Sequence, residues 1–148
     1  MATDEKRTLV RRYFELFNSG ALEVVRDLVA ADYVLHGAAG AALDVQGVDG
    51  FIRRVAGLRA AFPDYHATVD AVIVEGDTAG VRYSGQGTHR GPFRGLTPTG
   101  KQIAYSGMVF LRIAANRIAE EWLCWDALGV MQQLGALPSS NAPAPGRS

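Results

Sequence analysis

RIAEEWLCWDALGVMQQLGAL, residues 117–137, joins the pattern of a strand to the pattern of a helix. Residues 117–125 are rich in the β-branched and aromatic types that favour strands, and apolar residues then recur at helical spacing as far as Gly135. Asp126 stands at the joint between the two patterns. A carboxylate at this place accepts hydrogen bonds from the free N–H groups of the helix, so Asp126 is interpreted either as an N-cap or as a cavity acid or base.

Three helical patterns precede the strand predicted at residues 117–125. Further strands are predicted between the third helix and that strand. Apolar residues recur at helical spacing over residues 3–20, 22–32 and 48–62, and Pro63 directly follows the third of these segments. A short extended run is predicted at residues 33–36, between the second and the third helix. After Pro63 the period changes from helical to alternating, which predicts strands over residues 67–75, 79–89 and 103–113 as well as 117–125. This order predicts an α+β fold, in which three N-terminal helices cover a strongly bent, cone-shaped antiparallel sheet and enclose a cavity.

The chain has the size of one domain. Its 148 residues, 48% of them hydrophobic, suffice for a core that holds a pocket. We assign residues 1–137 to this domain and residues 138–148, which are rich in Pro, Ser and Ala, to a flexible tail. The Gly- and Ala-rich segment 37–44 is predicted to be a flexible loop.

The composition argues against several classes of partner and cofactor. The 15 basic and 15 acidic residues cancel, so the chain offers no field for nucleic acid or for an anionic membrane. Cys124 is the single cysteine, and no Cys/His cluster has the spacing of a zinc site, so neither a disulfide nor a metal is expected. No basic leader with an apolar run precedes the domain, and no apolar stretch approaches the roughly 20 residues that span a bilayer. We therefore expect a cytoplasmic protein.

Four motifs follow one another between residues 6 and 137. They are FNSG at residues 17–20, FPD at 62–64, GTHRGPFRGLTPTG at 87–100, and DALG at 126–129 closing with QLG at 133–135. The third motif is the most specific, because it specifies many residue types at set spacings within 14 positions, unlike a single Gly-rich triplet. In this order the motifs resemble those of the SnoaL-like polyketide cyclases, within the larger class of folds built like nuclear transport factor 2.

The resemblance implies a cone fold, a hydrophobic small-molecule ligand and chemistry without a cofactor. Family members of known activity close a polyketide ester by an intramolecular aldol reaction, in which one aspartate removes an acidic proton and returns it to the developing alkoxide. The resemblance also implies a homodimer that pairs through the outer face of the sheet. Four side chains supply apolar area there: Met108, Phe110, Trp122 and Cys124.

The chain departs from the family pattern at two positions. The catalytic aspartate of the cyclases follows a tryptophan late in the last strand, whereas this chain has Leu123 after Trp122. Val109 stands where a histidine is expected. Because a leucine cannot move a proton, the alternative to an enzyme is a ligand-binding protein that kept the cone and lost its base.

Two side chains besides Asp126 are candidates for a catalytic acid or base. Glu121 shares one face of the last strand with Leu123, so it is either an inward carboxylate near Tyr105 or a charge at the rim. His89 belongs to the most specific motif, where it either contacts substrate or holds the loop at the cavity mouth. The candidate substrate contacts are Phe17, His36, Phe51, Arg54, Tyr105, Val109 and Leu123.

Two further activities are found on the same fold and stay open. Tyr13 has the residue type of the first-helix tyrosine in the oxyanion hole of ketosteroid isomerases, but residues 33–42 offer no carboxylate for the base. Epoxide hydrolases on this fold hold one water between two aspartates and an arginine. Asp126 and Arg54 supply two of these three groups.

Overall fold

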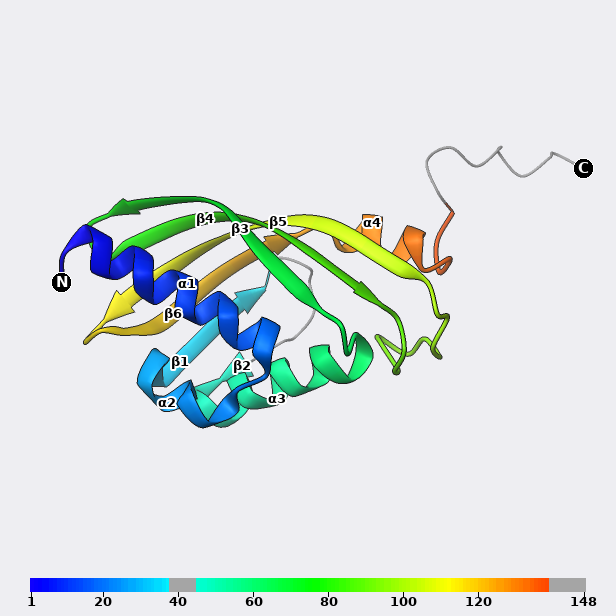
Figure 1. Ribbon diagram of the computed structural model, residues 1–148, viewed down its shortest axis with the longest axis horizontal. Coiled ribbons are helices and arrows are strands. Elements are labelled where there is room, and N and C mark those ends of the chain that lie inside the picture. The colour runs from blue at the N-terminus through cyan, green and yellow to red at the C-terminus, as the bar shows by residue number, and fades with distance from the viewer. Residues whose placement is uncertain (38–44, 139–148) are drawn as a thin grey trace, which may run out of the picture.

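The structure is a computed structural model and describes residues 1–37 and 45–138. In these residues a six-stranded sheet bends over the N-terminal helices (Figure 1). The predicted flexible loop beyond Gly37 and the predicted tail beyond Pro138 lie outside the described residues. None of the helices in the described parts is long and apolar enough to cross a membrane.

Two strands lie between the second and the third N-terminal helix, four strands follow the third helix, and a short helix follows the last strand. The helices are α1 (Thr3–Ser19), the 3-10 turn η1 (Leu22–Val24), α2 (Val25–Leu28), α3 (Gly47–Ala61) and α4 (Ala127–Gln133). The strands are β1 (Val29–Gly37), β2 (Val45–Gln46), β3 (His66–Glu75), β4 (Thr78–Thr88), β5 (Gln102–Ala114) and β6 (Arg117–Trp125). They lie side by side in the order β2-β1-β6-β5-β4-β3.

The predicted fold class is confirmed, since N-terminal helices pack on one bent sheet. The sheet is mixed rather than wholly antiparallel, because β1 pairs in parallel with β6 while the other neighbours are antiparallel. The second helix is shorter than predicted. From Val29 onward the chain pairs with β6 instead, where a strand edge satisfies its backbone groups and suits its β-branched side chains.

The side chains of α1 explain where this helix begins, ends and packs. Asp4 and Glu5 lie in the first turn, where negative charge is favourable, and Gly20 follows the last turn in the left-handed conformation with φ 68°. The buried stripe of α1 includes Tyr13 and Phe17, and the helix packs against β3 and β4. Helix α3 packs against β1 and β2. The two helices and the concave face of the sheet therefore surround the interior from three sides (Figure 1).

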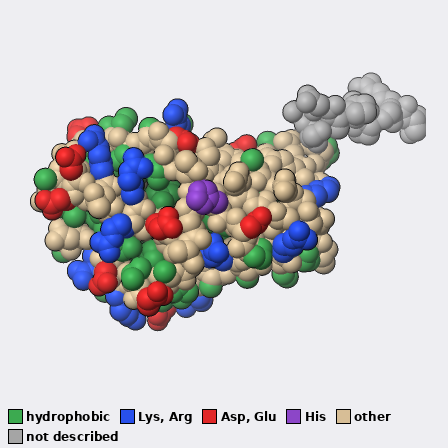
Figure 2. All heavy atoms as spheres, viewed as in Figure 1, with side chains coloured by type: hydrophobic (Ala, Val, Ile, Leu, Met, Phe, Trp, Pro, Cys, Tyr) green, Lys and Arg blue, Asp and Glu red, His purple; other side chains and the backbone are tan. Residues whose placement is uncertain are grey.

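The surface carries charges of both signs, as the balanced composition predicts. Lys and Arg side chains are interspersed with Asp and Glu side chains on the face seen in Figure 2, and apolar side chains lie between them. Among the described residues on this face, no large patch of a single sign stands out.

Candidate functional site

A cavity of about 670 Å³ lies between the sheet and the helices α1 and α3. Small-molecule sites commonly have volumes of about 300 to 1,000 Å³. Aromatic and aliphatic side chains make up most of the wall, and the charged side chains that line it are Arg53, Arg54, Arg94 and Glu121. A wall of this kind binds a hydrophobic ligand and holds its polar atoms at a few defined places.

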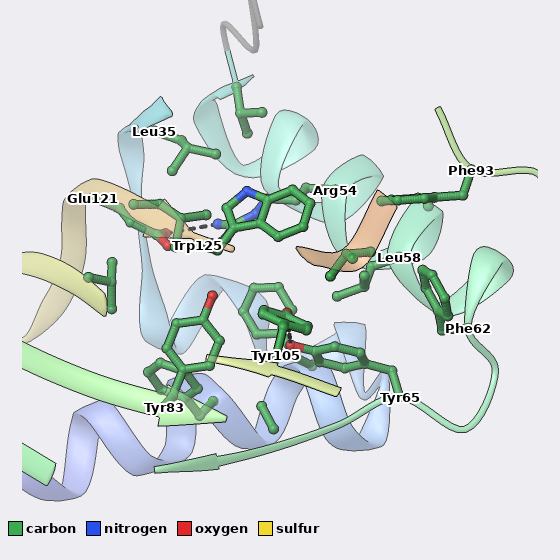
Figure 3. Close-up of a pocket in the computed structure, with 18 of the residues that line it drawn as sticks. Leu35, Arg54, Leu58, Phe62, Tyr65, Tyr83, Phe93, Tyr105, Glu121 and Trp125 are labelled. Atoms are coloured by element: carbon green, nitrogen blue, oxygen red, sulfur yellow. Dashed lines mark hydrogen bonds and ion pairs between the residues drawn. The ribbon is translucent and has the colours of Figure 1, made fainter. Parts of the chain in front are cut away.

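Glu121 lies in the charged part of this wall. Its side chain is 2% exposed, and Arg54 binds both of its oxygens: Nη1 lies 2.8 Å from Oε2, and Nη2 lies 3.1 Å from Oε1. The hydroxyls of Tyr13 and Tyr33 also donate to Oε2. Figure 3 shows the Arg54–Glu121 pair at one side of the cavity. From the described residues Oε2 thus accepts three hydrogen bonds, whereas Oε1 accepts one and keeps a lone pair for a further partner.

These contacts fix the charge of Glu121. Burial alone would raise the pKa of this carboxyl, but the Arg54 charge and the hydrogen bonds that the carboxylate accepts outweigh burial and hold the pKa below its ordinary value. Burial raises the pKa of the Tyr13 phenol, and the neighbouring Glu121 charge raises it further. Glu121 is therefore an anion at neutral pH, and Tyr13 is a neutral hydrogen-bond donor.

Alternation along β6 explains why Glu121 faces inward. Glu121 and Leu123 line the cavity, whereas Trp122 is exposed on the other face of the sheet. Arg54 reaches the carboxylate from α3, and its guanidinium also lies over the Phe17 ring, 5.0 Å from the centroid. A flat aromatic face beside the cation stabilises it where water is scarce.

A second polar group lies on the part of the wall formed by β4, β5 and the residue that directly precedes β3. The hydroxyls of Tyr65 and Tyr105 are 2.7 Å apart, and the Tyr83 ring packs edge-on against Tyr105 with centroids 6.1 Å apart. All three side chains line the cavity, and Figure 3 shows the Tyr65 and Tyr105 hydroxyls meeting away from the Glu121 carboxylate. We call Tyr65, Tyr83 and Tyr105 the tyrosine cluster.

Most of the predicted site residues lie in the cavity wall. These residues are Phe17, Arg54, Tyr105, Val109, Glu121 and Leu123. Val109 and Leu123 pair directly across β5 and β6. The two positions at which the chain departs from the cyclase pattern are therefore neighbours and together form one apolar patch of the wall.

Two predicted substrate contacts lie outside the cavity. Leu35 lines the cavity, so alternation along β1 turns His36 to the outer face of the sheet. There His36 Nε2 lies 2.7 Å from a Glu120 oxygen, and its ring stacks on Trp122. Phe51 is fully buried, but it packs behind the wall against aromatic rings of α1 and β1. Neither His36 nor Phe51 is therefore assigned to substrate.

Asp126 is an exposed N-cap of α4. Its Oδ1 accepts a hydrogen bond from the Gly129 N–H at 2.9 Å, and its side chain is not part of the cavity wall. A Cβ on Gly129 would overlap the Asp126 carboxylate, which explains the glycine at the end of the DALG motif. Of the two interpretations of Asp126, the geometry matches the cap.

His89 is buried in the loop that follows β4. Its Nδ1 accepts a hydrogen bond from the Thr99 N–H at 3.2 Å, and its backbone N–H donates to Lys101 O at 2.9 Å. The imidazole lies against Phe62 and Phe93, whose rings line the cavity. His89 thus lies one layer behind the wall, where it holds the loop and packs against two aromatic side chains of the wall.

One further part of the cavity wall combines a cation with an aromatic ring. The Arg94 guanidinium lies 5.0 Å from the centroid of the Trp125 ring, and both side chains line the cavity. The described residues contain no group of three or more His, Cys, Asp or Glu side chains arranged to hold a metal ion. The polar groups available to a ligand in this wall are therefore guanidiniums, phenols and the Glu121 carboxylate.

Reasoning from sequence missed Tyr33, Tyr65 and Tyr83. Tyr33 reaches Glu121 because β1 joins the sheet beside β6, a pairing that the sequence did not predict. The tyrosine cluster had a detectable signal, since the tripeptide Tyr-Ser-Gly occurs at residues 83–85 and again at 105–107. Two such tripeptides on antiparallel neighbours place each tyrosine opposite the glycine of the other.

Comparisons with known proteins identify relatives of this chain and of its fold. A sequence model of the SnoaL-like polyketide cyclase family matches residues 7–134. The aklanonic acid methyl ester cyclase DnrD of Streptomyces peucetius is 28% identical over 129 residues, which cover 86% of this chain and 88% of that relative. The structure of IdmH from Streptomyces antibioticus is 33% identical, with a TM-score of 0.74 over 87% of this chain and 97% of its own. TsrD from Streptomyces laurentii, at 23% identity, has the same fold with a TM-score of 0.83 over 93% of this chain and 99% of its own.

Proposed function

The chain belongs to the SnoaL-like polyketide cyclase family, and from this membership we propose that it is an enzyme that cyclises a hydrophobic carbonyl compound by acid/base chemistry without a cofactor. Glu121 takes the part of the aspartate that Leu123 replaces. One observation carries the proposal: a buried carboxylate in the wall of an apolar cavity, with a lone pair left on Oε1 and a guanidinium beside it.

Oε1 of Glu121 is the atom that accepts the proton. Oε2 is occupied by its three donors, whereas Oε1 accepts only the Arg54 hydrogen bond at 3.1 Å from the described residues. A C–H group between two carbonyls is acidic, so even a carboxylate of lowered pKa removes its proton once the apolar wall holds that carbon against Oε1. The C–H electron pair stays on the substrate, which becomes an enolate.

Arg54 stabilises the charge that this transfer moves. Before the transfer its guanidinium faces the Glu121 carboxylate, and afterwards it faces a neutral carboxyl and an enolate oxygen. The positive charge therefore stabilises the enolate as it forms, in a wall where little water competes. The sum of the charges in the site does not change during the step.

The enolate carbon then attacks a ketone carbon of the same molecule. A carbon–carbon bond forms, the π bond of the ketone breaks, and the resulting alkoxide takes the proton back from Glu121. Substrate and product contain the same atoms, and the enzyme returns to its starting state. The lowered pKa of Glu121 favours this last transfer, because a stronger acid gives up its proton more readily.

The rival function is that of a ligand-binding protein without turnover. It is favoured by the apolar patch of Val109 and Leu123 and by the lowered pKa of Glu121, which makes this carboxylate a weak base. The isomerase alternative has less support, because the Tyr13 hydroxyl donates to Glu121. The epoxide hydrolase alternative has less support as well, since Asp126 caps α4 away from the cavity wall and Glu121 is the one carboxylate that the described residues contribute to this wall.

Turnover of an ester tests the proposal. The compound named for the relatives, aklanonic acid methyl ester, is a suitable substrate, and chromatography detects a cyclised product of unchanged mass. We expect Glu121→Gln to lower kcat at least about 100-fold, because the amide keeps the shape but not the proton transfer. Asp126→Asn is the matched control and should retain the parent kcat. Full turnover by Glu121→Gln would contradict the role of Glu121, and binding without turnover by the parent would favour the rival function.

A further inference from the structure

The tyrosine cluster owes its geometry to the two Tyr-Ser-Gly tripeptides. Strands β4 and β5 pair so that each tyrosine faces the glycine of the other strand: Tyr83 faces Gly107, and Tyr105 faces Gly85. Each ring lies close over its glycine, because a Cβ at Gly85 or Gly107 would lie only 2.6 Å from the Cζ atom of the facing tyrosine. The glycines thus make room for two phenol rings on the concave face, where the third phenol of the cluster joins them.

The hydrogen bond between Tyr65 and Tyr105 uses only one of the two O–H groups of this pair. The two side chains bring two O–H groups, and the contact between their oxygens at 2.7 Å uses one of them, whichever residue donates. Either residue can be the donor of this contact, so the other one keeps an O–H group that is free to donate to a ligand in the cavity.

The phenols of the cluster stay protonated at ordinary pH. Burial raises the pKa of Tyr65, Tyr83 and Tyr105. A neutral phenol donates one hydrogen bond, so the partner that completes the cluster is an acceptor. Carbonyl oxygens and phenolate oxygens are acceptors of this kind.

The cluster and the Glu121 carboxylate lie at different places along the cavity. On β5 the residue that faces Glu121 is Leu111, and up to about 20 Å of strand separates Leu111 from Tyr105 at roughly 3.4 Å per residue. Figure 3 shows the Tyr65–Tyr105 contact and the Arg54–Glu121 pair on different sides of the cavity. A ligand that contacts both groups is therefore an extended molecule rather than a single small ring.

We propose that the tyrosine cluster is a second polar subsite, which binds a carbonyl or phenolate oxygen of the ligand at the end remote from Glu121. The proposal deepens the proposed function, on which it rests for the reacting end of the ligand. It narrows the substrate class to extended apolar skeletons with an acceptor oxygen at each end. The Trp125 ring packs edge-on against Tyr105, with centroids 5.6 Å apart, so Trp125 lies beside this subsite. The fluorescence of Trp125 should therefore change when a ligand binds there.

Two unreactive tricyclic probes test the subsite: fluorenone has a carbonyl group at the position where fluorene has a methylene group. A Trp122→Phe background leaves Trp125 as the remaining one of the 2 tryptophans, so quenching of its fluorescence measures fluorenone affinity. Displacement of fluorenone measures fluorene affinity. We expect fluorenone to bind about tenfold more tightly, the size of one hydrogen bond to a buried donor. The C=O stretch of bound fluorenone should lie at lower frequency than in an alkane solvent.

The double variant Tyr65→Phe, Tyr105→Phe removes the hydroxyls and keeps the rings. It should lose both the fluorenone preference and the frequency shift, while unchanged fluorene affinity shows that the cavity is folded. Glu121→Gln is the control and should keep both signals. Equal affinity of the parent for the two probes, a preference that survives in the double variant, or a preference lost in Glu121→Gln would each overturn the proposal. Because the probes do not react, failure of the catalytic role of Glu121 would leave these results unchanged.

Discussion

Glu121 carries a buried charge that its neighbours balance. Arg54 contributes the opposite charge, and the phenols of Tyr13 and Tyr33 contribute hydrogen bonds, so the carboxylate is stable in a wall that excludes most water. These partners belong to α3, α1 and β1. One carboxylate of β6 therefore connects this strand to α1, α3 and β1, and its protonation state affects the stability of the fold as well as the chemistry.

The lowered pKa of Glu121 makes stability depend on pH. In the unfolded chain a glutamate takes up its proton near about pH 4.3, whereas folded Glu121 does so only at lower pH. Between these two values the unfolded state binds more protons, so the free energy of unfolding falls as the pH falls. We expect the parent to lose this stabilisation below about pH 4.3, and Glu121→Gln, which cannot titrate, to show no such loss from this position.

Urea unfolding at a series of pH values measures this difference. The gap in the free energy of unfolding between the parent and Glu121→Gln should narrow as the pH falls. Glu75→Gln, at an exposed glutamate of β3, is the matched control and should follow the parent. A gap that stays constant down to about pH 3, well below the ordinary glutamate pKa, would contradict the lowered pKa of Glu121.

Asp126 caps the N-terminus of α4. Asn caps a helix about as well as Asp, so Asp126→Asn should keep the parent stability, whereas Asp126→Ala should lower the free energy of unfolding by about 1 kcal/mol. Neither change should lower kcat, because the side chain is exposed and not part of the cavity wall. Thermal unfolding and ester turnover check both expectations. A variant Asp126→Asn that melts like the parent but has lost turnover would return the acid or base role to Asp126.

The face of a residue on a strand is predictable from sequence, but its distant partners are not. Alternation along 117–125 predicted that Glu121 and Leu123 share a face, because the period of a strand depends only on its own backbone. Arg54 and Tyr33 lie 67 and 88 positions from Glu121 along the chain, and they meet it only through the packing of α3 and β1. The same packing turns His36 outward, which the order of the elements alone did not reveal.

At the level of elements, the close pairing of β4 with β5 requires glycine opposite tyrosine. A Cβ at position 107 would lie 2.6 Å from Tyr83 Cζ, so Gly107→Ala must displace this ring. We expect the free energy of unfolding to fall by about 1 to 3 kcal/mol. Gly57→Ala, in α3, is the matched control because its Cβ would meet nothing within 4 Å, and it should be neutral or stabilising by up to about 1 kcal/mol. Urea unfolding that finds the two variants equally stable would contradict this packing.

Elements with a strong period of their own were predicted well. Helices α1 and α3 and strands β3 to β6 lie where helical or alternating spacing placed them. Strand β1 was predicted only as a short extended run, and β2 was not predicted, because the pairing of these strands with β6 and with each other determines them. A strand of two residues, such as Val45–Gln46, has no period to detect.

In the whole molecule, one face of the sheet lines the cavity and the other faces outward. The outer-face patch consists of five exposed side chains: Ile73, Met108, Phe110, Trp122 and Cys124. Phe110 is 60% exposed and pairs directly with Trp122 across β5 and β6. A contiguous apolar patch of this kind is typical of an interface between proteins, so a homodimer remains our prediction.

Sedimentation velocity at micromolar concentration checks the homodimer. We expect the parent to sediment as a dimer and Phe110→Glu as a folded monomer, because a charge in the patch would be buried without a partner. Leu128→Glu is the matched control, since Leu128 is also 60% exposed but belongs to α4, outside the outer-face patch. Leu128→Glu should remain a dimer. A parent that sediments as a monomer would contradict the prediction.

Proton transfer by Glu121 is tested most directly by exchange of the substrate proton with solvent. A β-keto ester too short to cyclise is incubated with the protein in D2O at a pH where uncatalysed exchange is slow, and NMR follows the signal of the proton between the two carbonyls. If Oε1 removes and returns that proton, the parent and Asp126→Asn accelerate exchange to the same extent, and Glu121→Gln leaves it at the rate in buffer. Exchange in Glu121→Gln as fast as in the parent would contradict proton transfer by Glu121.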